Sequence, residues 1–196
     1  MGRTSDAREK LIDAARELMW ERGFVDVGVS ELCQKAGVKP GSFYYFFPSK
    51  TDLTAEALEA HWQHTYENVL QPAAEAENPL DRLTRMLALT GQSYKTLQAE
   101  TGRSCGCPFG NLSGEMQALE PELQDKLRGM FDRYHTYIED ILRDAQAQGL
   151  VELADIPRAA RAVTAYIEGV QMLAHVYNDA TLLEDLLPDL HRLLGA

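Results

Sequence analysis

Two cysteines separated by one glycine carry the most evident chemistry in this sequence. They lie in the stretch SCGCP, residues 104–108, directly before a helix that the proline is expected to open. The unpaired N–H groups at a helix start stabilise a thiolate, the nucleophilic form of cysteine, and Arg103 adds a nearby cation. The pattern predicts a thiol sensor in which Cys107 reacts with an oxidant or electrophile and Cys105 acts as its resolving partner.

The cysteine pair also has simpler interpretations. Cys105 and Cys107 suit a purely structural role, as small residues that line a turn and a ligand pocket. A metal site is less well supported, because the histidines beyond residue 60 stand singly in expected helices and add no ligand at a recognisable spacing. We therefore expect neither a metal nor another cofactor.

A second candidate site lies near the N-terminus, where Val29 to Lys50 read as two short helices joined by a glycine turn. Gly37 supplies the turn, and Pro40 lies in the first turn of the second helix, where its missing N–H costs nothing. The second helix carries the aromatic run FYYFF, residues 43–47, which is too short to form a core of its own. This is the pattern of a helix-turn-helix that docks on DNA.

The N-terminal end of that second helix is expected to read bases, because this end enters the major groove. The residues there are Lys39, Pro40, Gly41 and Ser42. Lys39 suits a guanine edge or a phosphate, whereas the proline and glycine allow close approach and contact with a thymine methyl. Ser30, near the positive end of the preceding helix, is expected to bind a phosphate.

The elements that must position these residues are helices. Apolar residues recur at helical spacing almost throughout, and no stretch shows sustained alternation, so the fold is expected to be all-α with about nine helices. Residues 1–50 are expected to form a three-helix DNA-binding domain, and residues 51–196 a helical effector-binding and dimerisation domain. The expected helices include residues 5–22, 30–36, 50–70, 78–99, 108–119, 121–149 and 182–194, with Pro72 stopping the helix at 50–70.

The net charge of −11 is unusual for a DNA-binding protein, but it is unevenly distributed. Residues 1–50 hold eight Lys or Arg against seven Asp or Glu, which gives +1, and residues 51–196 hold 11 against 23, which gives −12. An acidic body repels phosphate and disfavours non-specific contacts. DNA binding is therefore expected to rest on local cations and helix N-termini in the first 50 residues.

Residues 8 to 60 resemble the DNA-binding domain of the TetR family of bacterial transcriptional regulators. The first helix ends in the Gly-aromatic pair Gly23-Phe24, and the recognition pattern V-x-x-G-x-hydrophobic-Y-x-x-F-x-x-K is filled from Val38 to Lys50. One position departs from the family, which commonly has Ser or Thr as the N-cap of the second helix. Gly28 stands there, a weaker but usable cap without a hydroxyl for phosphate.

The resemblance implies a role for each aromatic residue of the recognition segment. Tyr44 and Lys50 would bind phosphates, Tyr45 and Phe46 would lie on the DNA face, and Phe43 and Phe47 would be core. Two alternatives stay open: Phe46 also suits the core, and Tyr44 also suits simple packing with its hydroxyl in water.

These features predict a transcriptional regulator, most simply a repressor that binds a palindromic operator as a homodimer and is released by a small-molecule or thiol-reactive effector. The pattern GCxxxNLSxE, which runs from Gly106 to Glu115, resembles a TetR subgroup that contains electrophile- and oxidant-responsive repressors. A non-covalent effector would instead bind among aromatic, methionine and histidine side chains of the body. The expected lining residues are Trp62, Tyr66, Tyr94, Phe109, Met116, Phe131, Tyr134 and His175.

The last two helices are the expected dimer interface, in a four-helix bundle like that of TetR regulators. The segment after Pro157 carries a stripe of small residues, and the terminal segment is Leu-rich on more than one side. The small stripe also suits packing within one subunit.

A thiol enzyme and a helical interaction module are the rival classes. Thiol oxidoreductases usually bring a βαβ pattern, which this sequence lacks, and no HExxH or phosphate-loop motif occurs. An interaction module leaves the aromatic segment unexplained. No apolar run approaches the roughly 20 residues that span a bilayer, and the N-terminus lacks a signal sequence, so a cytoplasmic protein without a membrane partner is expected.

Overall fold

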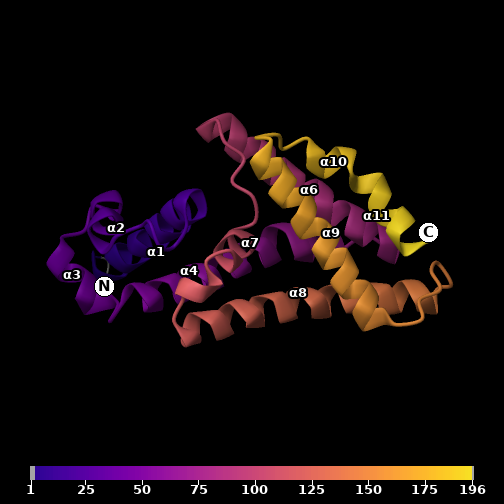
Figure 1. The fold of residues 1–196 in the computed structure, drawn as a ribbon, viewed down its shortest axis with the longest axis horizontal. Helices are drawn as coiled ribbons and strands as arrows, with labels where there is room; N and C mark the ends of the chain where they lie inside the picture. The colour runs from indigo at the N-terminus through magenta and orange to yellow at the C-terminus, as the bar shows by residue number, and fades with distance from the viewer. Residues whose placement is uncertain (1–2, 196) are drawn as a thin grey trace. The chain divides into compact units, whose positions relative to one another are not determined.

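The computed structural model describes residues 3–195, and every regular element within this range is helical (Figure 1). The prediction of an all-α fold is therefore confirmed. The chain forms two compact units. The first unit comprises Met1–Gln63 and Pro108–Gly129, and the second comprises His64–Cys107 and Met130–Ala196.

The first unit contains the expected helix-turn-helix. Its elements are α1 (Arg3–Arg22), α2 (Val29–Ala36), α3 (Pro40–Phe46), most of α4 (Lys50–Thr65), α7 (Pro108–Ser113), a 3-10 turn (Met116–Ala118) and the start of α8 (Pro121–Ala147). Two glycines with positive φ end the first two helices, Gly23 at 84° and Gly37 at 65°. Left-handed backbone is the conformation that favours glycine, so both helix ends follow from the sequence.

A single core joins the first helices of this unit. It consists of apolar side chains spaced at helical intervals on α1, α2, α3 and α4, together with residues of the connecting loops. Its fully buried members include Leu11, Ala15, Val27, Leu32, Cys33, Phe43, Phe47 and Leu53. The free energy of burying these side chains holds α3 in place, although a helix of seven residues is too short to be stable alone.

The second unit is a bundle of longer helices. Its elements are the π-helix Tyr66–Leu70, α5 (Gln71–Ala74), α6 (Pro79–Thr101), the larger part of α8, α9 (Ile156–Val176), α10 (Leu182–Asp185) and α11 (Leu187–Leu194). Figure 1 shows α10 and α11 lying along α6 and α9.

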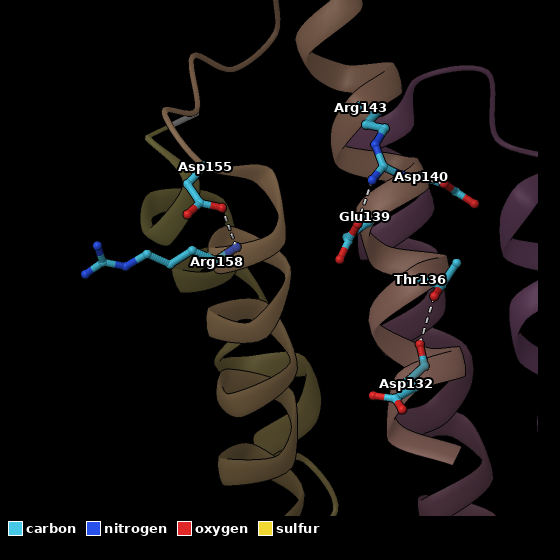
Figure 2. Close-up of polar contacts among 7 residues, drawn as sticks. All are labelled: Asp132, Thr136, Glu139, Asp140, Arg143, Asp155 and Arg158. Atoms are coloured by element: carbon cyan, nitrogen blue, oxygen red, sulfur yellow. Dashed lines mark hydrogen bonds and ion pairs between the residues drawn. The ribbon is translucent and has the colours of Figure 1, made fainter. Parts of the chain in front are cut away.

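Side-chain caps mark where two of these helices begin. Asn78 accepts a hydrogen bond from the amide of Leu80 at 2.8 Å. Asp155 accepts one from the amide of Arg158 at 2.9 Å, which Figure 2 shows. Figure 2 also shows the ion pair of Arg143 with Glu139, at 2.6 Å, on α8. Caps satisfy amides that have no partner within the helix, and each contributes about 1 kcal/mol.

Pro72 does not stop the helical path, so that expectation is wrong. The residues before it widen into a π-helix, in which the amide of Gln71 bonds to the carbonyl of Tyr66, five residues earlier. Proline has no amide to donate, and its ring crowds the carbonyl four residues before it. The wider turn accommodates the proline, and α5 continues to Ala74.

The helices expected at 108–119 and 182–194 are each interrupted. The first ends at Ser113, before Gly114, and is followed by the 3-10 turn. The second breaks at Leu186, because Pro188 near the start of α11 has no amide for the carbonyl of Glu184. No helix among residues 3–195 is long and apolar enough to cross a membrane.

Candidate functional site

The helix α3 separates its aromatic residues onto two faces. Phe43 and Phe47 are 0% and 1% exposed, whereas Tyr44 and Tyr45 are 65% and 76% exposed. Residues four apart share a face of a helix, so the two phenylalanines fix α3 to the core while the tyrosines between them point outward. The core assignment of Phe43 and Phe47 is thereby confirmed.

An open groove lies at the start of α3. Its lining comes from α1, the turn after α2 and α3 itself. The lining residues are Ala7, Gly37, Val38, Lys39, Gly41, Ser42, Tyr45 and Phe46. The structure therefore brings three of the four expected base-reading residues together with Tyr45 and Phe46. Pro40 is exposed at the same helix end, and Ser30 is exposed in the first turn of α2.

Phe46 belongs to the core and to the groove at once. It is half-buried and packs against the hydrophobic cluster of the first unit, while the exposed part of its ring lines the groove. The sequence left open whether Phe46 lies in the core or on the outer face, and its ring is in fact divided between the two. A contact of Phe46 with DNA stays a prediction.

Lys50 braces the loop between α1 and α2. Its Nζ donates hydrogen bonds to the carbonyls of Phe24, at 2.7 Å, and Val27, at 3.0 Å, and lies 4.0 Å from the centre of the Phe24 ring. Burial lowers the pKa of Lys50, and the nearby carboxylate of Glu115 acts in the opposite direction. The sequence did not indicate this structural role, and the expected phosphate contact stays a prediction.

The cysteine segment is held in the second unit by the end of α9. The amide of Ser104 donates to the side chain of Asn178 at 2.8 Å, and Nδ1 of His175 lies 2.6 Å from the carbonyl of Ser104. Cys105 and Cys107 are both buried. His175, expected as a pocket residue, therefore contacts the backbone of the cysteine segment.

The thiol of Cys107 lies beside a carboxyl group that the sequence did not indicate. It donates a hydrogen bond to Glu168 on α9, and burial raises the pKa of Glu168 while this hydrogen bond lowers it. Glu168 is therefore placed to accept the thiol proton. The available sequence signal was an acidic residue directly after the buried Ile167, on a helix whose neighbours are mostly small and apolar.

Two tyrosines and a glutamine complete this buried polar cluster. The hydroxyl of Tyr94, on α6, donates to Oε1 of Gln171, on α9. Burial raises the pKa of Tyr94 and of Tyr134, on α8, and Cys107 and Glu168 add to this effect. The hydroxyls therefore stay protonated and act as hydrogen-bond donors or acceptors. Gln171 was also missed from the sequence.

The other residues expected in an effector pocket are divided between the units. Trp62, Phe109 and Met116 belong to the first unit, where the Phe109 ring lies edge-on to that of His61 with centroids 5.3 Å apart. Tyr66 and Phe131 belong to the second unit, the former exposed and the latter half-buried. The second unit thus gathers Tyr94, Tyr134, both cysteines and His175 around α6, α8 and α9.

Two family models match this chain. Residues 11–57 match the family model described as bacterial regulatory proteins of the tetR family, and residues 79–188 match the tetracyclin repressor-like C-terminal domain. The chain is 34% identical over 143 residues to the transcriptional regulator AcuR of Cereibacter sphaeroides, covering 73% of this chain and 64% of AcuR. It is 30% identical over 122 residues to the transcriptional repressor NemR of Escherichia coli K12, covering 62% of this chain and 60% of NemR.

Solved structures extend the likeness over nearly the whole chain. The crystal structure of a regulatory protein TetR from Rhodobacter sphaeroides superposes with a TM-score of 0.82 at 29% identity, covering 95% of this chain and 97% of that one. The matches to two family models and the outward-facing α3 of a helix-turn-helix lead to the same assignment. This chain belongs to the TetR family and is a DNA-binding transcriptional regulator.

Proposed function

We propose that this protein represses transcription as a homodimer that binds a two-fold symmetric operator through α3, and that an effector acting at Cys107 releases it. The observation that carries the proposal is the groove at the start of α3, whose lining includes Lys39, Ser42 and Tyr45. The repressor direction is supported by the relative NemR, which is a transcriptional repressor.

In the proposed complex, the N-terminal end of α3 enters the major groove. Lys39 reads a base edge, and Pro40, Gly41 and Ser42 allow close approach. Tyr44, which is exposed beside them, binds a phosphate together with Ser30 at the start of α2. Few of these groups are donors, so the spacing of two half-sites supplies much of the selectivity.

The proposed dimer interface uses α9 and α11. Several large apolar side chains are exposed on these helices or directly after them, which supports burial against a second copy of the chain. They are Met172, Val176, Tyr177 and Leu193. Two-fold symmetry would place one α3 helix from each copy at the two halves of a palindrome.

The proposed effector is an electrophile such as an α,β-unsaturated carbonyl compound. Glu168 takes the proton of the Cys107 thiol, and the sulfur forms a bond with the β-carbon of the electrophile. The electron pair of the C=C bond moves towards the carbonyl, and the α-carbon then takes the proton back from Glu168. The sum is addition of S–H across the double bond, which leaves a new group in a tightly packed interior.

A non-covalent effector is the second candidate, and the polar atoms around the cysteines support it. Tyr94, Tyr134 and Gln171 offer hydroxyl and amide groups, and the Ser104 hydroxyl is buried without a hydrogen-bond partner among the described residues. A small polar molecule with several acceptors would satisfy such groups.

The two candidates are separated by DNA binding in the presence of N-ethylmaleimide. The DNA is the double-stranded fragment that wild-type protein selects from a random library. We expect the alkylating agent to release wild type and Cys105→Ser but not Cys107→Ser, with Cys33→Ala as a control for the third thiol. Equal release of all variants, or release of none, points to the non-covalent candidate. Absence of any selected DNA at low salt would contradict the operator-binding function itself.

A further inference from the structure

Glu115 makes a long-range contact that the functions described above do not use. It lies between α7 and the 3-10 turn and is half-buried. Its Oε1 accepts a hydrogen bond from the amide of Phe24 at 3.0 Å, and its Oε2 accepts one from the amide of Val25 at 2.7 Å. A carboxylate that receives two consecutive amides makes charge-assisted hydrogen bonds, which are stronger than neutral ones.

Gly23, which has no side chain, leaves room for this contact. A Cβ atom at this position would lie 1.9 Å from Oε1 of Glu115, far inside the closest allowed approach. Gly23 also has a φ of 84°. Glycine is therefore favoured at this helix end, and its missing side chain leaves room for the carboxylate to reach the two amides.

Glu115 and Lys50 hold opposite polar groups of one loop. Glu115 binds the amides of Phe24 and Val25, and Lys50 binds the carbonyls of Phe24 and Val27. This loop ends at Gly28, whose carbonyl accepts the first hydrogen bonds of α2. The two side chains together fix the point at which the helix-turn-helix begins.

The segment that carries Glu115 begins directly after Cys107 in the chain. Within the first unit, its far end is anchored by Gln124, whose side chain donates to the carbonyls of Met116 and Leu119, both at 3.0 Å, and by the ion pair of Lys126 with Glu59 at 2.6 Å.

The packing of α7 against α1 and α4 is incomplete. A mostly apolar cavity remains between these helices, and its lining includes Met19, Trp20, Leu58, His61, Pro108 and Leu112. Apolar contacts alone therefore leave α7 room to shift. The hydrogen bonds of Glu115 are directional and restrict that shift.

We propose that Glu115 is a positioning residue for DNA binding, which ties the loop before α2 to the segment that follows Cys107. A displacement of α7 pulls on the Phe24 and Val25 amides through the carboxylate and changes the start of α2. The inference rests on the proposed operator binding for its functional part. Its structural part, the hydrogen bonds to the two amides, is tested separately.

The test compares Glu115→Gln with Glu122→Gln in the full-length protein. Both substitutions remove one negative charge from the same unit, but Glu122 is exposed and lies outside the loop contact. In Glu115→Gln, we expect amide hydrogen exchange, followed residue by residue by NMR, to accelerate about tenfold or more at Phe24 and Val25. The amide of Gly23, which bonds to the carbonyl of Met19 at 2.9 Å, is the internal control and keeps its rate.

The second measurement is the dissociation constant for the double-stranded fragment selected by wild-type protein. We expect Glu115→Gln to raise it about tenfold, because misplacing the start of α2 weakens the contacts of α2 and α3 together. Glu122→Gln is expected to equal wild type, and Glu115→Asp, which keeps the charge on a shorter stem, to fall between. Thermal melting verifies that each variant is folded, and Glu115→Asp replaces the glutamine variant if that one is not.

Three results overturn the inference while the proposed function stands. They are unchanged exchange at Phe24 and Val25, exchange that accelerates equally at Gly23, and DNA affinity that equals wild type despite faster exchange. Failure of wild-type protein to select any DNA instead contradicts the proposed function, and the exchange measurement then decides the structural part alone.

Discussion

At the scale of single residues, the carboxyl group of Glu168 beside the Cys107 thiol determines how the interior of the second unit responds to pH. Burial raises the pKa of Glu168 above its ordinary value of 4.5. The folded protein therefore binds this proton more tightly than the unfolded chain does. The contribution of Glu168 to the free energy of unfolding is most favourable below pH 4.5 and is lost as pH rises through the folded pKa.

Glu168→Gln removes this pH dependence. Relative to the variant, we expect the free energy of unfolding of wild type to fall as pH rises from about 4.5 towards neutrality. The measurement is urea unfolding at a series of pH values, with Glu152→Gln as a control at an exposed position. Parallel curves for wild type and Glu168→Gln would show that the carboxyl is not perturbed by folding.

Gly23 offers a second prediction at this scale. Gly23→Ala and Gly37→Ala both place a side chain at positive φ, but only the first meets another group, the carboxylate of Glu115. We expect Gly37→Ala to cost about 1 kcal/mol of stability and Gly23→Ala about 1–3 kcal/mol more, because the added methyl displaces the carboxylate from the Phe24 and Val25 amides. In a Glu115→Ala background the extra cost should vanish, which denaturant unfolding of the double variant measures. An extra cost that persists there would trace to the loop backbone instead.

At the scale of elements, α3 combines an internal and an external role in seven residues. Phe43 and Phe47 hold α3 to the core. Lys39 and Tyr44 are exposed, and they are proposed to contact different parts of the DNA. Lys39 lies at the end that is proposed to enter the major groove, and Tyr44 lies about one turn further on. We therefore expect substitutions of Lys39 and Tyr44 to change DNA affinity and sequence preference in different ways.

We expect Lys39→Ala to change affinity by about 1–3 kcal/mol at one operator position and to relax the sequence preference there. Tyr44→Phe should weaken binding to all sequences by a similar factor, because a phosphate contact carries no base information. Affinities for a set of single-base-pair operator variants distinguish the two patterns. A Lys39→Ala profile that parallels wild type on every variant would remove its base-reading role.

At the scale of the whole molecule, the proposed dimer holds two copies of α3 so that each can bind one half of a symmetric operator. Val176 and Leu193 are exposed on α9 and α11, and a charge at either position would be buried in the proposed interface. We expect Val176→Glu and Leu193→Glu to give monomers in sedimentation experiments and to lose most of their operator affinity. Val25→Glu, at an exposed apolar position of the first unit, is the control and should remain dimeric. Dimers that persist in both α9 and α11 variants would place the interface elsewhere.

The sequence by itself determined those features that depend on residues close together in the chain. Glycine at Gly23 and Gly37 ended the first two helices, the family resemblance assigned Phe43 and Phe47 to the core, and helical periodicity excluded a sheet. The consequences of proline were predicted less well. Pro72 and Pro188 disturb the helices around them, but whether the chain responds with a π-helix or a break depends on the packing of its neighbours.

Only the tertiary structure decided the contacts that link distant parts of the chain. Glu115 meets amides about 90 residues away, and Glu168 meets the thiol of Cys107 in the irregular segment before α7. Lys50, which the family pattern suggested for phosphate, braces two carbonyls of a loop. Periodicity and capping rules describe interactions within about one turn of helix, whereas the partner of a charged side chain across the fold depends on how helices pack. For that reason the sequence predicted the DNA-binding helices, but it did not predict the residues that are proposed to connect them to the segment around Cys107.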